Sequence, residues 1–253
     1  MLDKINYYSI SKHGKKSRHN EDYVAIPSSK FEINKLEKYG YFFVLCDGIG
    51  GAKAGEIASK TCAKSLFNNY YQSPPIDDFR LHILSTINSI NDKIIGIAND
   101  FPQYQGMGTT LVSLLLKDDY AFLNNVGDSR AYIWNQQKFI QITDDQSPAW
   151  ESYRKGQISK DEILDCKYKN LITEAIGINP EPEILSYQLH LPEKFIFLLC
   201  SDGLTDVCLD SELEEIISKT KSLKDGIDDL YNLAVDHQSL DDISIILVSN
   251  YLD

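Results

Sequence analysis

The sequence is short of cysteine, and the cysteines that it has form no recognisable pattern. There are 5 of them, an odd number, and no C-x-x-C pair occurs. Both features disfavour a disulfide framework and a structural zinc site. Cys46 and Cys200 lie inside apolar runs, so we expect both thiols to be buried and reduced.

The sequence also lacks an apolar stretch long enough to span a bilayer. Its first residues, MLDKINYYSISKHGKKS, contain no segment that resembles a signal peptide. We therefore expect a cytoplasmic protein.

Basic residues are in deficit. The chain has 25 Lys and Arg against 37 Asp and Glu, which gives a formal net charge of -12. Such a surface repels phosphate backbones and anionic lipid, so we expect neither nucleic acid nor a membrane as a partner. An acidic chain can still bind phosphate when metal ions supply the positive charge.

Two common catalytic arrangements are missing as well. Ser201 stands in CSDG and lacks the G-x-S-x-G turn of a hydrolase triad. The histidines show neither His-x-His nor H-E-x-x-H spacing, so a histidine-based metal site has no support. They are His13, His19, His82, His190 and His237.

What remains is an ordinary globular composition with clear periodicity. The 253 residues are 43% hydrophobic and 25% charged, and no linker interrupts them, so we expect a single domain over 1–253. Apolar residues at helical spacing predict an antiparallel pair of helices over 54–70 and 79–101, and another helix over 223–236.

Further patterns predict strands and one more helix. Ser211 with Glu214 resembles a capping box and predicts a helix start. Apolar runs between polar turns predict strands over 109–116, 120–126, 131–134, 138–142, 195–200 and 243–249. Clustered strands with paired helices favour α+β layers over alternating βαβ units.

Several of the apolar runs end in a carboxylate. Asp47 ends the run in YFFVLCDGIGG, Asp202 follows FIFLLCS, and Asp128 follows YAFLNNVG. Asp241 stands in mirror order, ahead of the run in DDISIILV. If these strands share a pair of sheets, their carboxylates converge at one edge.

Converging carboxylates repel one another, and each then favours a raised pKa or a cation. Oxygen ligands without His or Cys suit Mg²⁺ or Mn²⁺ rather than zinc. Gly48 and Gly203 follow two of these aspartates, and we expect the missing β-carbons to leave room around an ion.

These residues carry a resemblance to the metal-dependent protein phosphatases of type 2C, in the order that this family shows. The matching segments are NED (20–22), CDGIGGAKAGEIAS (46–59), GTT (108–110), VGDSRAYIW (126–134), ITDDQS (142–147), LITEAIG (171–177), CSDGLTD (200–206) and DDIS (241–244). The resemblance implies an α+β fold: a sandwich of two antiparallel sheets flanked by pairs of antiparallel helices, as four α-β-β-α layers.

The resemblance also implies a binuclear Mn²⁺ or Mg²⁺ centre. In it, Asp47 would bridge two ions and the Gly48 carbonyl would bind one of them. Asp202 and Asp241 would complete the other, and Asp128 would help Asp202 to hold a third, weaker ion. Glu21 or Asp22 would reach the ions directly or through water. No ligand carboxylate of the family is lost in this chain.

The implied activity is hydrolysis of phosphoserine and phosphothreonine in proteins by a metal-activated hydroxide. The partner would be a phosphorylated protein made by an opposing serine/threonine kinase, and the chain would act as a monomer. Two alternatives stay open: a pseudophosphatase that binds phosphoproteins without turnover, and a phosphatase for small phosphorylated metabolites.

Two further regions follow from the resemblance. Family members place a phosphate-binding arginine at the position of Ser17 here, so Arg18 or Lys16, each one residue away, is the expected phosphate ligand. Residues 147–170 match a flap beside the active site. In the flap we expect Trp150 and Tyr153 to act as anchors, and Arg154, Lys155 and Lys160 to guide the substrate.

Overall fold

The computed structural model describes residues 5–15, 19–28, 33–50, 54–74 and 78–253. Its first sheet has the strand order β1-β12-β11-β8-β9. These strands are β1 (Asn6–Lys12), β12 (Ile243–Ser249), β11 (Ile196–Cys200), β8 (Arg130–Trp134) and β9 (Phe139–Gln141).

The second sheet has the order β10-β7-β6-β3-β2, and a short ribbon pairs β4 with β5. The strands of the second sheet are β10 (Leu185–His190), β7 (Tyr120–Val126), β6 (Leu111–Lys117), β3 (Tyr41–Cys46) and β2 (Tyr23–Ala25). The ribbon consists of β4 (Gly48–Ile49) and β5 (Gly108–Thr109). All of these pairings are antiparallel.

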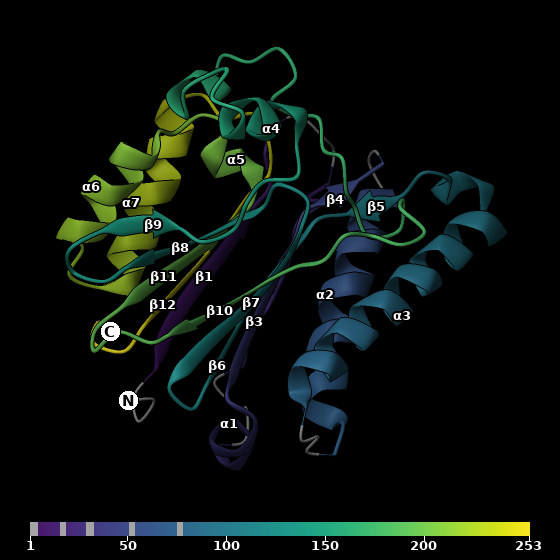
Figure 1. The fold of residues 1–253 in the computed structure, drawn as a ribbon, viewed down its shortest axis with the longest axis horizontal. Helices are drawn as coiled ribbons and strands as arrows, with labels where there is room; N and C mark the ends of the chain where they lie inside the picture. Colours follow the sequence, from purple (N-terminus) through teal and green to yellow (C-terminus); the bar gives the residue numbers. More distant parts are fainter. Residues whose placement is uncertain (1–4, 16–18, 29–32, 51–53, 75–77) are drawn as a thin grey trace.

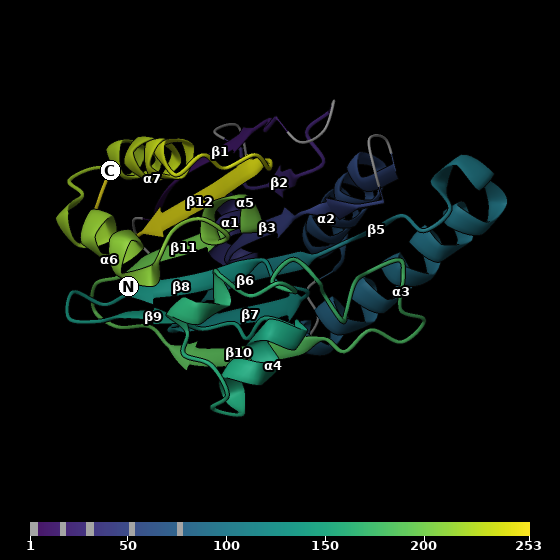
Figure 2. The ribbon, with the colours of Figure 1, turned by 90° about the horizontal axis from the view of Figure 1, so that it is seen from above.

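Helices cover both outer faces of the sandwich. On one side lie α2 (Ala54–Gln72) and α3 (Phe79–Asp100), and on the other lie α6 (Asp210–Lys219) and α7 (Leu223–Asp236) (Figure 1). Figure 2, seen from above, shows the same order of helices, sheets and helices. The predicted α+β, four-layer sandwich is confirmed. Shorter elements are α1 (Ile33–Tyr39), α4 (Pro148–Arg154), α5 (Asp202–Thr205), η1 (Pro102–Tyr104) and η2 (Asp161–Ile163).

The central strands explain why their apolar runs are nearly continuous. In β3, Phe43 and Leu45 face the core between the sheets, whereas Phe42 and Val44 face helices α2 and α3. Successive strand residues point to opposite faces, so a strand that is covered on both sides needs apolar residues at every position. β11 follows the same rule between the inner core and helices α6 and α7.

Helix boundaries agree with the sequence except at α6. The side chain of Asp78 caps α3, and Ser222 caps α7. The predicted capping box of Ser211 and Glu214 is wrong, because α6 begins earlier, at Asp210. Its cap uses Glu212, whose Oε2 accepts a hydrogen bond from the backbone N–H of Leu209 at 2.8 Å.

None of the helices among the described residues has both the length and the apolar character needed to cross a membrane.

Candidate metal centre

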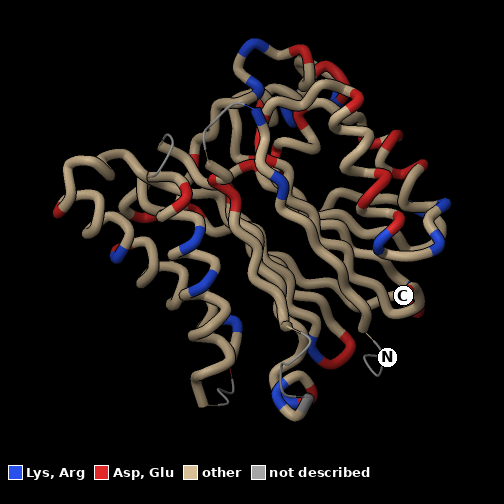
Figure 3. The backbone as a smooth tube through the Cα atoms, turned by 180° about the vertical axis from the view of Figure 1, so that it is seen from behind, with Lys and Arg blue, Asp and Glu red and all other residues tan. Residues whose placement is uncertain are grey.

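The predicted carboxylates come together at one end of the sandwich. β11 runs antiparallel to both β8 and β12, with Cys200 opposite Arg130 and Ile245. The end of β11 therefore lies beside the starts of β8 and β12, which places Asp202 at the same end as Asp128 and Asp241. Helices α4 and α5 and the β4–β5 ribbon lie at this end (Figure 1). Figure 3 shows acidic segments there as well.

The turn after β3 is fixed by its own backbone and by threonines. The carbonyl of Asp47 accepts hydrogen bonds from Thr109 Oγ1 and from the N–H of Thr110, both at 2.8 Å. A β-carbon on Gly48 would overlap the backbone of Gly55 in α2. Glycine at position 48 thus allows α2 to approach this turn closely.

Gly203, after Asp202, has the same kind of role. A β-carbon there would overlap the carbonyl of Asp242. The expectation that both glycines leave room around an ion therefore misses their main structural role. Each one lets a second backbone segment pass close to a carboxylate-bearing turn.

Glu21 and Asp22 reach the same turns from the β1–β2 connection. The carbonyl of Glu21 accepts hydrogen bonds from the N–H of Gly48 at 3.1 Å and from Ser59 Oγ at 2.5 Å. Asp22 is only 5% exposed, and its Oδ2 accepts a hydrogen bond from Ser201 Oγ at 2.8 Å. Its Oδ1 is buried and has no hydrogen-bond partner among the described residues.

Asp242 was not among the residues expected at this centre. It is buried and accepts hydrogen bonds from the N–H groups of Gly14 and Glu21, each at 2.7 Å, and it lies 3.0 Å from Nδ1 of His13. Asp242 thereby holds the β1–β2 connection against the start of β12. In the pair Asp241-Asp242 only the three-dimensional structure separates this supporting residue from a candidate ligand.

Burial and mutual repulsion act on three of the carboxylates. The pKa of Asp47 is raised well above its ordinary value, mainly by burial and then by repulsion from Asp22 and Asp202. Burial is also the main cause of the raised pKa values of Asp22 and Asp128, with repulsion from Asp202 added in both. These groups are therefore close enough to oppose one another's ionisation.

The donor set fits a hard, hydrated cation. All of the converging side chains offer oxygen, and Asp22 Oδ1 is a buried acceptor that no described group satisfies. Among the described residues, no three His, Cys, Asp or Glu side chains are already gathered as a direct ligand cage. Mg²⁺ suits such an arrangement, because it keeps several waters and takes only one or two carboxylates directly.

The predicted phosphate ligands cannot be placed. Arg18 and Lys16 both lie outside the described residues.

Residues 147–170, which the sequence predicts to be a flap, bury the aromatic side chain expected to anchor them. Trp150 is 5% exposed, and its Nε1 donates a hydrogen bond to Asp144 Oδ1 at 3.2 Å. The ring of Tyr153 packs on that of Trp150, with the centroids 5.1 Å apart. The expectation that Lys160 guides the substrate is not supported, because Lys160 forms an ion pair with Asp210 of α6.

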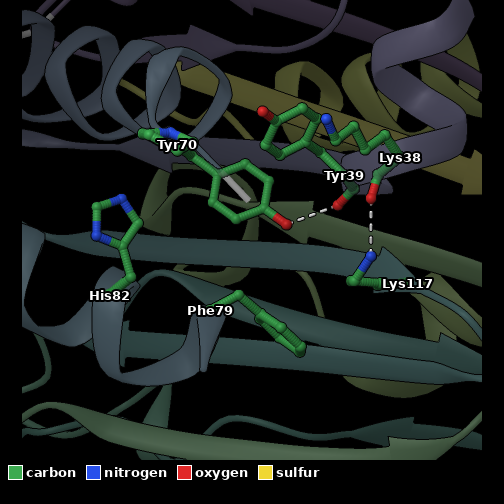
Figure 4. Close-up of a pocket in the computed structure, with 7 residues that line it drawn as sticks. Lys38, Tyr39, Tyr70, Phe79, His82 and Lys117 are labelled. Carbon is green, nitrogen blue, oxygen red and sulfur yellow. Dashed lines mark hydrogen bonds between the residues drawn. The ribbon is translucent and has the colours of Figure 1, made fainter. Parts of the chain in front are cut away.

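A separate pocket at the far end of the sandwich does not belong to this centre. It measures about 50 Å³ and is lined by Lys38, Tyr39, Tyr70, Pro74, Phe79, His82 and Lys117. Tyr70 donates to the carbonyl of Tyr39 at 2.6 Å, and Lys117 donates to the carbonyl of Lys38 at 2.9 Å (Figure 4). These polar groups serve the fold, and β3 separates the pocket from Asp47.

Comparison with known families decides the classification. The family model described as "Protein phosphatase 2C" matches residues 11–240. This chain belongs to the protein phosphatase 2C family. The match includes all of the carboxylates proposed as ligands, except Asp241, which directly follows its end.

Relatives in this protein phosphatase 2C family resemble the chain over nearly its whole length. The serine/threonine phosphatase stp of Listeria innocua is 29% identical over 242 residues, covering 94% of this chain and 93% of that protein. The crystal structure of Stp1 from Staphylococcus aureus has a TM-score of 0.86 at 31% identity, covering 97% of this chain and 95% of that one.

A third relative is the catalytic domain of the phosphatase PstP, in complex with 2 manganese ions. It has a TM-score of 0.81 at 26% identity, covering 98% of this chain and 99% of that one. That relative therefore binds manganese in a fold similar to the one described here.

Proposed function

We propose that this chain is a metal-dependent phosphatase that hydrolyses phosphoserine and phosphothreonine in proteins. The observation that carries this proposal is the set of buried, mutually repelling carboxylates at one end of a protein phosphatase 2C sandwich. A cation would remove the repulsion, so the site favours divalent metal ions over an uncharged ligand.

In the proposed centre, the ions are Mn²⁺ or Mg²⁺ and at least two are bound. Asp47 and the Gly48 carbonyl bind them from the β3 turn, and Asp202 and Asp241 bind from the opposite sheet. Glu21 or Asp22 contributes directly or through water. Asp128 and Asp202 hold a third, weaker ion.

The chain's own groups bind and orient rather than attack phosphorus. Burial raises the pKa values of Cys46 and Cys200 above the ordinary thiol value, so neither is a thiolate at neutral pH. When bound, divalent cations offset charge on the phosphoryl oxygens and make water a stronger nucleophile near neutral pH. Arg18 or Lys16 grips the phosphate, as a charge-assisted donor.

The substrate is a phosphorylated protein, the opposing enzyme is a serine/threonine kinase, and the working form is a monomer. The names of the relatives support the substrate class, since stp and Stp1 are both described as serine/threonine phosphatases.

The direct test is release of phosphate from a phosphothreonine peptide. We expect turnover with Mn²⁺ or Mg²⁺ and none with excess chelator. Asp228→Asn, an exposed change on α7, serves as the matched control for loss of a carboxylate. Metal binding without turnover would instead indicate a pseudophosphatase, and turnover of phosphorylated metabolites alone would indicate the small-molecule alternative.

A further inference from the structure

The flap is a small body with its own apolar cluster. Its buried members are Ala149, Trp150 and Ile163, and they form a cluster separate from those of the sandwich. Tyr153, Ile158 and Cys166 pack against this cluster. A segment with so little core of its own depends on contacts with the body to hold its position.

A chain of polar contacts connects the flap to the body. Arg130, at the start of β8, donates from Nη2 to Asp145 Oδ2 at 2.6 Å and from Nη1 to the hydroxyl of Tyr132 at 3.2 Å. The Tyr132 hydroxyl donates to Asp210 Oδ1 at 3.0 Å. The other oxygen of Asp210 accepts from Nζ of Lys160, in the flap.

Lys160 differs from a typical surface lysine. It and Asp210 are each 29% exposed, and they are 50 residues apart in the sequence. Its ammonium also lies 5.4 Å from the ring centroid of Trp150 and 6.0 Å from that of Tyr132. Aromatic faces attract a cation, so three contacts hold this one charge between flap and body.

Lys155 offers the contrast within the same flap. It pairs with Glu151 one helical turn away in α4, and both side chains are 60% exposed or more. Such a local, solvated pair contributes little and cannot fix the flap to the body.

The contact chain ends beside the candidate metal centre. Arg130 lies two residues after Asp128, and Lys169 of the flap donates to the carbonyl of Asp206 at 2.9 Å. Asp206 repels Asp128, whereas Arg130 favours its charged form. The contacts of Lys160 thus connect, through Asp210, Tyr132 and Arg130, to a point two residues from Asp128.

We propose that Lys160 is a positioning residue. Its ion pair with Asp210, braced by Tyr132 and Arg130, holds the flap beside the metal centre and thereby sets the affinity for a phosphoprotein substrate. Because its contacts are with Asp210, Tyr132 and Trp150, which are not candidate ligands, we expect the chemical step to stay unchanged. This inference rests on the proposed function for its kinetic test, whereas its test of flap position does not.

The kinetic test compares a phosphothreonine peptide with a small aryl phosphate. In Lys160→Met we expect KM for the peptide to rise about fivefold, which is the upper range for a partly exposed ion pair. kcat for both substrates and KM for the aryl phosphate should stay within error. Lys160→Arg should restore the peptide KM, because it keeps the charge. Lys219→Met, which removes an exposed pair with Glu215 on α6, should match the wild type.

Asp210, the ion-pair partner of Lys160, can be tested by its own variant. Asp210→Asn should raise the peptide KM as Lys160→Met does, and the double variant should be no worse than either single change. Additive losses would show that the two residues act separately and would overturn the proposal. So would equal losses on peptide and aryl phosphate.

Flap position can be measured without any enzymatic activity. Cys166 lies in the flap and is the one cysteine among the described residues that is not buried, so a thiol reagent will modify it first. We expect faster modification of Cys166 in Lys160→Met and wild-type rates in Lys160→Arg and Lys155→Met, at equal melting temperatures. An unchanged rate of Cys166 modification in Lys160→Met would overturn the proposal that the Lys160–Asp210 pair holds the flap. This result would count even if the wild type proved to have no phosphatase activity.

Discussion

Two buried polar regions of this protein meet at the β7–β8 turn and satisfy their carboxylates in opposite ways. At Arg130, both oxygens of Asp145 accept guanidinium N–H groups, at 2.6 to 2.9 Å. Two residues earlier, Asp128 belongs to a group of carboxylates whose pKa values are raised by burial and mutual repulsion. In that group Asp22 Oδ1 makes no hydrogen bond within the described residues.

The difference shows in which region the protein itself balances the charge of its buried carboxylates. A buried carboxylate with a bidentate guanidinium partner has its charge balanced and its acceptors satisfied. A buried carboxylate that faces other carboxylates has neither, and native structures rarely tolerate this arrangement without a function. The first region therefore supports the fold, and the second is where the proposed metal ions would supply the missing positive charge.

Removing the carboxylate at the middle of the acidic group should have the largest effect on activity. We expect Asp47→Asn to lower kcat about a thousandfold or more, because bound metal ions supply several kcal/mol of charge stabilisation. Phosphate release from a phosphothreonine peptide measures it. Because the change also relieves repulsion, the unfolding free energy in chelator should not fall. Retained turnover would contradict the assignment of Asp47 as the bridging ligand.

The balanced region should respond in the reverse manner. Arg130→Met leaves Asp145 buried without its guanidinium, and we expect a loss of about 3–5 kcal/mol in unfolding free energy. Urea denaturation measures this. Arg130→Met combined with Asp145→Leu is the control, because it removes the uncompensated charge and should recover much of the loss. If Arg130→Met lowered the unfolding free energy as little as Asp47→Asn does, the contrast between the two regions would fail.

The third prediction concerns Arg18, the positively charged side chain expected to bind the substrate phosphate. If it binds the substrate phosphate, Arg18→Ala should raise KM for a phosphopeptide by a factor equivalent to about 1.5–3 kcal/mol. Metal affinity by calorimetry should be unchanged, since the arginine would act on the substrate alone. Lys16→Ala is the matched variant, and a loss there with normal kinetics in Arg18→Ala would transfer the role to Lys16.

The smallest effect concerns pH. Asp47 has a raised pKa in the folded protein, so its contribution to stability is full below its ordinary pKa and is lost as pH rises towards the folded value. The amide in Asp47→Asn does not ionise and so has no such loss. In chelator, the stability of Asp47→Asn relative to wild type should therefore grow as pH rises above the ordinary aspartate pKa. If the unfolding free energies of the two proteins, measured by urea denaturation, depended on pH in the same way, burial and repulsion would not be raising the pKa of Asp47.

The sequence predicted the central strands and the long helices because their patterns are local. Strands covered on both faces are apolar throughout, as in β3 and β11, and the isoleucines of α3 recur at helical spacing. Edge strands were harder. β1 and β10 were not predicted, because β1 mixes polar with apolar residues and β10 alternates half-buried with exposed positions.

The sequence by itself determined which carboxylates are available as candidate ligands and that they stand at strand ends. Only the tertiary structure brought Asp47, Asp128 and Asp202 close enough to repel one another, since antiparallel pairing unites ends that are far apart in the chain. It also decided that Asp242 supports a loop, that Asp145 pairs with Arg130, and that Lys160 pairs with Asp210. Aspartates and lysines look alike in a sequence, and their roles differ only through the partners that folding gives them.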